Sequence, residues 1–227
     1  MRRISNLDSD TVYYQRVNDV YAFVLAGGKS TRMGQDKAFL RLGGETLLER
    51  AQKLAKSVTE NVRIVGDPAK FSVYGVVVPD MYPDRGPLGG IHAALVQTRT
   101  EFNLIMAVDT PFIEARFLDF IVSQARGGGA VVTVPRTGGY LHPLCGIYRR
   151  EFAAVSEKAL IREQNKIDRL FAGVQTRVIE EEEMAGMGFG AEMLRNVNTP
   201  DDWTDVQAWF KQYEKTDELY SKNERTQ

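Results

Sequence analysis

A glycine-rich segment with several cations directly follows the first apolar stretch of the chain. Residues 20–25 are apolar without interruption, and Gly27 and Gly28 follow them. Because glycine carries no Cβ, the backbone N–H groups of such a loop can approach phosphate oxygens closely. The alternative is an ordinary glycine turn with solvated cations, although open α/β sheets bind ligands at the carboxyl ends of their strands. We therefore expect a phosphate-binding loop, whose cations are Lys29, Arg32 and Lys37.

Two familiar glycine motifs do not fit this segment. The tripeptide at residues 28–30 resembles the end of a P-loop, but that motif needs a glycine five residues earlier, where this chain has Phe23. The dinucleotide-binding fingerprint needs glycines spaced as G-x-G, whereas Gly27 and Gly28 are adjacent. If this segment binds phosphate, it does so through neither of these two motifs.

Two aspartates each close a predicted strand. Asp109 comes directly after the most apolar segment, residues 103–108, and Asp80 closes residues 74–78. At the carboxyl end of a parallel strand, Asp109 would face the same crevice as the glycine-rich loop. There it could hold Mg²⁺, which takes one or two protein carboxylates and otherwise phosphate oxygens and water. The alternative is that Asp109 only caps the following helix, a role in which aspartate is common.

The elements that must position these residues alternate along the chain. Thr46 and Glu49 form a predicted capping box at the start of a helix, and Pro111 marks the predicted start of another. Alternating strands and helices indicate βαβ units and a mainly parallel sheet. The predicted strands are residues 20–25, 62–65, 74–78, 103–108, 130–134, 144–148 and 175–179, and the other predicted helices are residues 89–97, 151–160 and 201–213.

Composition limits the class of protein. The 227 residues carry 29 Lys and Arg against 30 Asp and Glu, and this balance argues against a general nucleic-acid binder. The single cysteine, Cys145, excludes an internal disulfide and fits a reducing compartment, so we expect a cytoplasmic protein. No apolar run is long enough to predict a membrane span or a secretory signal. We expect one domain over residues 20–213, an extension at 1–19 and a polar tail at 214–227.

The residues named above resemble one known family. The stretch L-A-G-G-x-S-x-R-M-G-x-D-K at residues 25–37 resembles the signature loop of the molybdenum cofactor guanylyltransferases, within the wider nucleotidyltransferase group. Residues 86–90 resemble the G-P-L-x-G segment of the guanylyl-transferring branch. Residues 109–111 match its Asp-Thr-Pro, and residues 196–202 resemble N-x-N-T-P-[DE]-[DE]. The resemblance runs in order from about residue 21 to about residue 210.

This resemblance implies a fold, a reaction and a cofactor. The fold is an α/β, three-layer α/β/α architecture with a mostly parallel twisted sheet, Rossmann-like and similar to GT-A nucleotidyltransferases. The reaction is Mg²⁺-dependent transfer of GMP from GTP to the phosphate of molybdopterin. The acceptor phosphate is largely dianionic at neutral pH, so it needs no general base to act as a nucleophile. Further implied partners are molybdoenzyme clients or cofactor-handling proteins, and neither nucleic acid nor a membrane.

The resemblance also implies roles for individual residues. Catalysis would involve Arg32, Lys37 and Asp109, with Asp109 as the metal ligand. Asp84 is an alternative to Asp80, because the loop between them differs from that of some relatives. The acceptor would be bound by His142, Asn196 and Asn198, although a loop histidine is often simply exposed and asparagines often serve turns. The nucleotide would contact Leu25, Ala26, Gly27, Gly28, Lys37, Asp80, Gly86, Pro87, Leu88, Gly89 and Asp109.

Two other functions stay open from the sequence. An enzyme of the same fold could use CTP or another nucleotide with a different phosphorylated acceptor. A non-catalytic adaptor could bind nucleotide and hand cofactor to a client enzyme. The presence of Arg32, Lys37 and Asp109 together argues against the adaptor, which has no need of a metal-binding carboxylate.

Overall fold

A computed structural model describes residues 19–27 and 36–211 of the chain. It contains an eight-stranded mixed sheet and a separate two-stranded hairpin. The strands are β1 (Val20–Leu25), β2 (Arg41–Leu42), β3 (Glu45–Thr46), β4 (Val62–Val65), β5 (Val77–Val78), β6 (Phe102–Ala107), β7 (Val132–Thr137), β8 (Tyr140–Leu141), β9 (Cys145–Arg149) and β10 (Thr176–Ile179).

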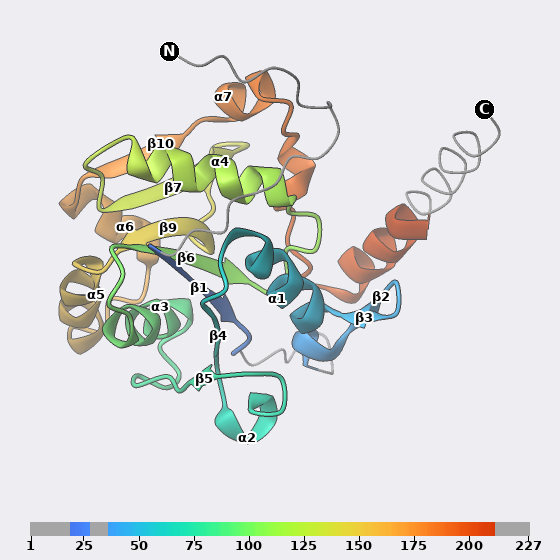
Figure 1. Cartoon of the computed structure of the whole chain (residues 1–227), viewed down its shortest axis with the longest axis horizontal. Coiled ribbons are helices and arrows are strands. Elements are labelled where there is room, and N and C mark those ends of the chain that lie inside the picture. Colours follow the sequence, from blue (N-terminus) through green and yellow to red (C-terminus); the bar gives the residue numbers. More distant parts are fainter. Residues whose placement is uncertain (1–18, 28–35, 212–227) are drawn as a thin grey trace, which may run out of the picture.

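Helices cover both faces of this sheet (Figure 1). The α-helices are α1 (Leu47–Val58), α2 (Pro68–Phe71), α3 (Pro87–Gln97), α4 (Ala115–Arg126), α5 (Phe152–Ile161), α6 (Ile167–Leu170) and α7 (Glu181–Gly186), and residues 200–211 are also helical. The short 3-10 helices in the described part of the chain are η1 (Lys37–Phe39), η2 (Phe171–Gly173) and η3 (Ala191–Leu194).

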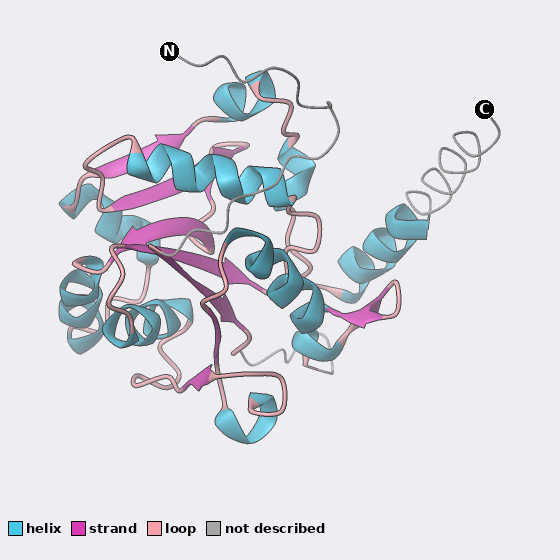
Figure 2. Cartoon of the chain, in the orientation of Figure 1, coloured by secondary structure: helices cyan, strands magenta, loops and turns pink. Residues whose placement is uncertain are grey.

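Strand β1 lies between two hydrophobic cores, which explains its uninterrupted apolar sequence. Ala22 and Val24 face the core formed with α1 and α4, whereas Phe23 and Leu25 face the core formed with α3 and α5. Helices and strands in Figure 2 accordingly form three layers, helix, sheet and helix. The predicted α/β class and mostly parallel sheet are confirmed.

The order of the strands is β10-β7-β9-β6-β1-β4-β5, with β8 paired to β7. Strands β5, β4, β1 and β6 are parallel, whereas β9 is inserted antiparallel between β6 and β7. In the β1–β6 pair, Leu25 lies opposite Ala107. The glycine segment after Leu25 and the aspartate after Ala107 therefore leave the sheet at the same edge.

Most predicted boundaries hold within a few residues, and two differ. The capping box at Thr46 and Glu49 is confirmed, because the Thr46 hydroxyl accepts the Glu49 N–H and the Glu49 carboxylate accepts the Thr46 N–H. The helix expected at Pro111 begins instead at Ala115, after turns at residues 108–112. The strand expected at 74–78 is reduced to Val77–Val78, because residues 72–75 form a turn after α2.

Three further expectations concern Cys145, membrane spans and the helix at residues 201–213. Cys145 is buried in β9 among apolar side chains, and burial raises the pKa of its thiol to about 12, so it is an unreactive core residue. Within residues 19–27 and 36–211, no helix is both long and apolar enough to cross a bilayer. The predicted helix at 201–213 is observed as far as residue 211, and its last two residues lie outside the described part.

Candidate active site

A cavity of about 580 Å³ opens at the edge of the sheet where β1, β4 and β6 end. Its walls come from segments far apart in sequence, which the parallel strands bring together. Most of the residues predicted to bind nucleotide line it: Leu25, Ala26, Gly27, Lys37, Asp80, Gly86, Pro87 and Asp109. Leu88 and Gly89 are buried behind this wall in α3, and Gly28 and Arg32 lie outside the described residues.

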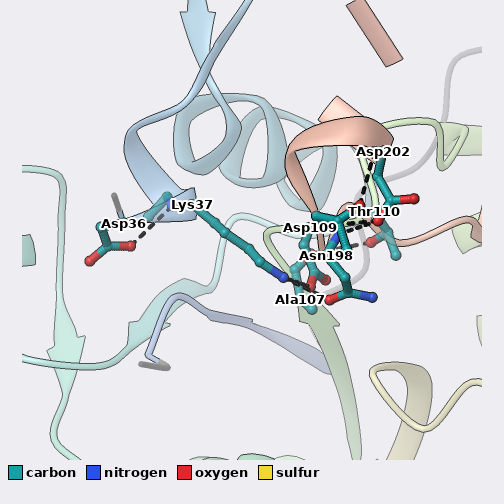
Figure 3. Close-up of polar contacts among 9 residues, drawn as sticks. Asp36, Lys37, Ala107, Asp109, Thr110, Asn198 and Asp202 are labelled. Atoms are coloured by element: carbon teal, nitrogen blue, oxygen red, sulfur yellow. Dashed lines mark hydrogen bonds and ion pairs between the residues drawn. The ribbon is translucent and has the colours of Figure 1, made fainter. Parts of the chain in front are cut away.

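Lys37 and Asp109, which line the cavity, meet each other there, and Asn198 contacts Lys37 from beside it (Figure 3). The Lys37 ammonium donates to Asp109 Oδ2 at 3.1 Å and to Asn198 Oδ1 at 2.7 Å. The side chains of Lys37 and Asp109 are 17% and 18% exposed, so the pair is mostly screened from solvent but still reachable. Asp109 lies 72 positions and Asn198 lies 161 positions from Lys37 in the sequence, and the fold joins the three residues in one charged cluster.

The backbone around this cluster is fixed by local hydrogen bonds. Asp36 caps η1, since its carboxylate accepts the Ala38 N–H at 3.1 Å, and this orients the first residue of η1, Lys37. The carbonyl oxygen of Asp109 accepts the N–H of Val197 at 2.8 Å. Asp109 lies ahead of Glu114, the N-cap of α4, so its carboxylate contacts Lys37 and does not cap that helix.

Asp80 and Asp84 both line the opposite end of the cavity, beside α3. Asp80 Oδ1 accepts the Tyr82 N–H at 2.8 Å, and burial raises the pKa of its carboxyl group above the ordinary value. A Cβ on Gly89 would lie 2.8 Å from both Asp80 carboxylate oxygens, so this position of α3 has room only for glycine. Asp84 is exposed and has a positive φ of 64°. Both aspartates remain candidates for the nucleotide contact.

The three predicted acceptor-binding residues do not lie together. Asn198 contacts Lys37, whereas Asn196, which precedes the buried Val197, is exposed; neither asparagine lines the cavity itself. His142 Nε2 forms a 2.6 Å hydrogen bond with Thr137 Oγ1 and also lies off this cavity. Burial lowers the pKa of His142, so its imidazole is neutral at neutral pH.

A second hollow lies next to the first, on the side of the β7–β8 hairpin. Its volume is about 500 Å³, and Pro87 lines both cavities. Its other walls include Arg136, Tyr140 and Pro143, so it lies close to the segment that carries His142. Tyr140 is 79% exposed, so its ring is accessible to a ligand.

Several residues of the main cavity were not predicted from the sequence. Lys70 of α2 lines it and pairs with Asp36 at 3.3 Å, and Phe71 packs against Gly66. The signal that could have found them is the Asp67-Pro68 pair after β4, which starts α2 at the same edge of the sheet. His92 of α3 is 2% exposed, with its ring against Tyr82.

The cavity wall suits a metal ion that binds together with a phosphorylated molecule. Among the described residues, no three His, Cys, Asp or Glu side chains form a cluster that could hold an ion unaided. Asp109 nevertheless presents one carboxylate to the cavity. One carboxylate is enough for Mg²⁺ when phosphate oxygens and water complete its octahedron.

Comparisons with known proteins agree with this geometry. Residues 22–180 match the family described as MobA-like NTP transferase domain. The probable molybdenum cofactor guanylyltransferase of Carboxydothermus hydrogenoformans is 35% identical over 79% of this chain and 91% of its own length. The molybdenum cofactor guanylyltransferase of Desulfosudis oleivorans is 31% identical, over 85% of this chain and 96% of its own length.

A solved structure supports the fold. Molybdopterin-guanine dinucleotide biosynthesis protein A from Archaeoglobus fulgidus superposes with a TM-score of 0.76, covering 85% of this chain and 99% of its own. The two sequences are 23% identical. At that identity, the likeness concerns the arrangement of the strands and helices.

Proposed function

The chain belongs to the MobA-like NTP transferase family, and we propose that it transfers GMP from GTP to the phosphate of molybdopterin. The products are the guanine dinucleotide form of the cofactor and pyrophosphate. An oxygen of the acceptor phosphate forms a bond to the α-phosphorus, and the bond from that phosphorus to the β-phosphate oxygen breaks. The observation that carries this proposal is the meeting of Lys37 and Asp109 in the cavity that follows β1.

The cavity suggests how the nucleotide would lie. Its long wall from Leu25 to Gly27 would run along the nucleotide, with the base toward Gly86 and Pro87 and the phosphates toward Lys37. Of the two aspartates beside the base end, Asp80 accepts the Tyr82 N–H through its carboxylate. We propose that the segment of residues 86–90 favours guanine.

The phosphate end carries the chemistry. Lys37, with Arg32 from the loop outside the described residues, would offset the charge on the triphosphate and on the leaving pyrophosphate. Asp109 would hold Mg²⁺ together with phosphate oxygens, and the ion would supply further neutralisation of charge at those oxygens. Because the acceptor phosphate is already ionised, positioning and electrostatics suffice without a general base.

The acceptor would approach from the side of Asn198 and the second hollow. Asn198 lies beside Lys37, and His142 lies on the segment between β8 and β9, next to that hollow. Since the His142 imidazole is neutral, it would contact an acceptor through a hydrogen bond instead of an ion pair. Asn196 stays a predicted acceptor contact.

The test is calorimetry with GTP, CTP, ATP and UTP, each with Mg²⁺, followed by a product assay with GTP and molybdopterin. We expect tightest binding of GTP and formation of the dinucleotide cofactor with pyrophosphate. Preference for CTP would indicate the alternative nucleotidyltransferase. Tight GTP binding without product would indicate the adaptor. A cytoplasmic location, molybdoenzyme clients, and the domain boundaries at residues 20 and 213 stay predictions.

A further inference from the structure

We infer that Asp202 is a positioning residue for Lys37, acting through the backbone of Asn198. The inference rests on the proposed function, in which Lys37 binds the triphosphate. Asp202 lies in the helix of residues 200–211, outside the set of residues that line the main cavity. Its carboxylate is nevertheless linked to the Lys37 ammonium through one residue (Figure 3).

The Asp202 carboxylate does more than cap its helix. Asp202 Oδ2 accepts the Thr199 N–H at 2.9 Å, and Thr199 Oγ1 accepts the Asp202 N–H at 3.1 Å. These two reciprocal bonds form a capping box, which is all that the helix requires. The same Oδ2 also accepts the Asn198 N–H at 2.9 Å. This third bond fixes the residue before the cap, whose side chain reaches the active site.

Asn198 is held in place from two sides. Val197, which precedes it, is fully buried, and the Val197 N–H donates to the Asp109 carbonyl oxygen at 2.8 Å. Consecutive N–H groups are thus bound to Asp109 and to Asp202, which lie on different segments. The backbone of Asn198 therefore has a fixed orientation relative to the Asp109 carboxylate.

The chemistry of the Lys37 ammonium fixes the orientation of the Asn198 amide. An ammonium group only donates hydrogen bonds, so the amide atom 2.7 Å from it must be the oxygen. Asp109 Oδ2, at 3.1 Å, contacts the same ammonium. A lysine side chain has four flexible carbons, and a second acceptor restricts the place of its charge more than one carboxylate does.

A double-mutant cycle with Mg²⁺ and GTP tests this inference. We expect Asp202→Ala to weaken nucleotide binding by calorimetry about tenfold when Lys37 is present, and by less than about twofold in a Lys37→Ala background. A purely structural role of Asp202 predicts the same factor in both backgrounds. Asp202→Asn keeps an oxygen that can accept the Asn198 N–H and should retain most of the affinity.

Two matched controls separate positioning from general damage to the helix. Asp205→Ala also removes an aspartate carboxylate from the helix of residues 200–211. The Asp205 carboxylate accepts a hydrogen bond from Arg195 at 2.8 Å. Thr199→Ala removes one bond of the capping box and leaves the Asn198 bond to Asp202. Both should bind GTP within about twofold of the wild type while lowering the thermal midpoint. Asn198→Ala should reproduce the loss and the dependence on Lys37, which provides a second variant if Asp202→Ala folds poorly.

The outcomes distinguish this inference from the proposed function. If Lys37→Ala weakens GTP binding but Asp202→Ala acts equally with and without Lys37, the positioning role is wrong and the function stands. If Thr199→Ala matches Asp202→Ala in affinity, the capping box alone explains the effect. If Lys37→Ala binds GTP as the wild type does, the proposed role of Lys37 fails, and the positioning role fails with it.

Discussion

Replacing Lys37 by alanine is the most direct test of how the cavity acts on phosphate. The Lys37 ammonium lies 3.1 Å from the Asp109 carboxylate, and its side chain is only 17% exposed. At about 3 Å and an effective dielectric constant of about 20, a charge pair is worth about 5 kcal/mol before desolvation and entropy are counted. Losing one preorganised donor costs about 3–4 kcal/mol in comparable sites. Turnover should therefore fall by about 10²- to 10³-fold.

Folding should change much less than turnover. The substitution leaves the Asp109 carboxylate, 18% exposed, without its lysine, which costs about 1 kcal/mol at a partly solvated site. For a domain of this size, that corresponds to a shift of about 2–4 °C in the thermal midpoint. The stability measurement thus separates a lost charge from a lost fold.

The assay measures pyrophosphate release with saturating GTP, Mg²⁺ and molybdopterin, and Lys70→Ala serves as the matched control. Lys70 lines the same cavity, but its side chain is 53% exposed and pairs with Asp36 at 3.3 Å. Solvent screens such a charge, so the control should keep turnover within about threefold. Turnover of Lys37→Ala above a third of the wild-type rate, or an equal loss in Lys70→Ala, would refute this reasoning.

Three further predictions concern other parts of the site. Asp109→Asn should remove Mg²⁺-dependent turnover with a shift of only a few degrees in thermal midpoint; full turnover would remove the metal assignment. Gly89→Ala places a Cβ 2.8 Å from the Asp80 carboxylate and 2.9 Å from the Tyr82 carbonyl oxygen, so urea unfolding should show a loss of about 1–3 kcal/mol. An unchanged unfolding free energy would contradict that contact. Burial lowers the folded-state pKa of His142, so the unfolded chain binds more protons and stability should fall as pH drops through about 6.5. His142→Gln should flatten this slope in urea titrations between pH 8 and pH 5; an identical slope would count against it.

The sequence could predict the elements that depend on local hydrogen bonds or on burial of both faces of a strand. Residues 20–25 and 103–108 form strands near the predicted bounds because both faces of β1 and β6 are buried, which makes their apolar runs continuous. Thr46 starts α1 because its capping box needs only residues three apart. The helix start predicted at Pro111 was wrong, and α4 begins at Ala115. The turn before α4 is held by a contact distant in sequence, in which the Val197 N–H donates to the Asp109 carbonyl oxygen.

The candidate site was predictable only in part, because several of its contacts join residues that are far apart in the sequence. The order of motifs along the chain placed Lys37 and Asp109 in one site, and the parallel strands β1 and β6 bring their segments to the same edge. The contact of Asn198 with Lys37 spans 161 positions, and no spacing rule reaches that far. The role of Asp202 depends on which N–H its carboxylate accepts, which only coordinates reveal.

The charges on the cavity wall lead us to expect that a nucleotide binds there together with Mg²⁺. Among the described residues that line the cavity, five are aspartates and two are lysines, a formal charge of −3. A bare triphosphate would be repelled by this wall, because like charges raise the energy of a partly buried site. We expect two sources of positive charge to reverse this balance: Mg²⁺ carried by the nucleotide, and the predicted phosphate-binding cations Lys29 and Arg32, which lie outside the described residues. The affinity for GTP should therefore depend on Mg²⁺ more steeply than expected if the ion contacted Asp109 alone. The reason is that the ion also offsets the negative charge of the other aspartates on the cavity wall. The aspartates are Asp36, Asp67, Asp80, Asp84 and Asp109, and the lysines are Lys37 and Lys70.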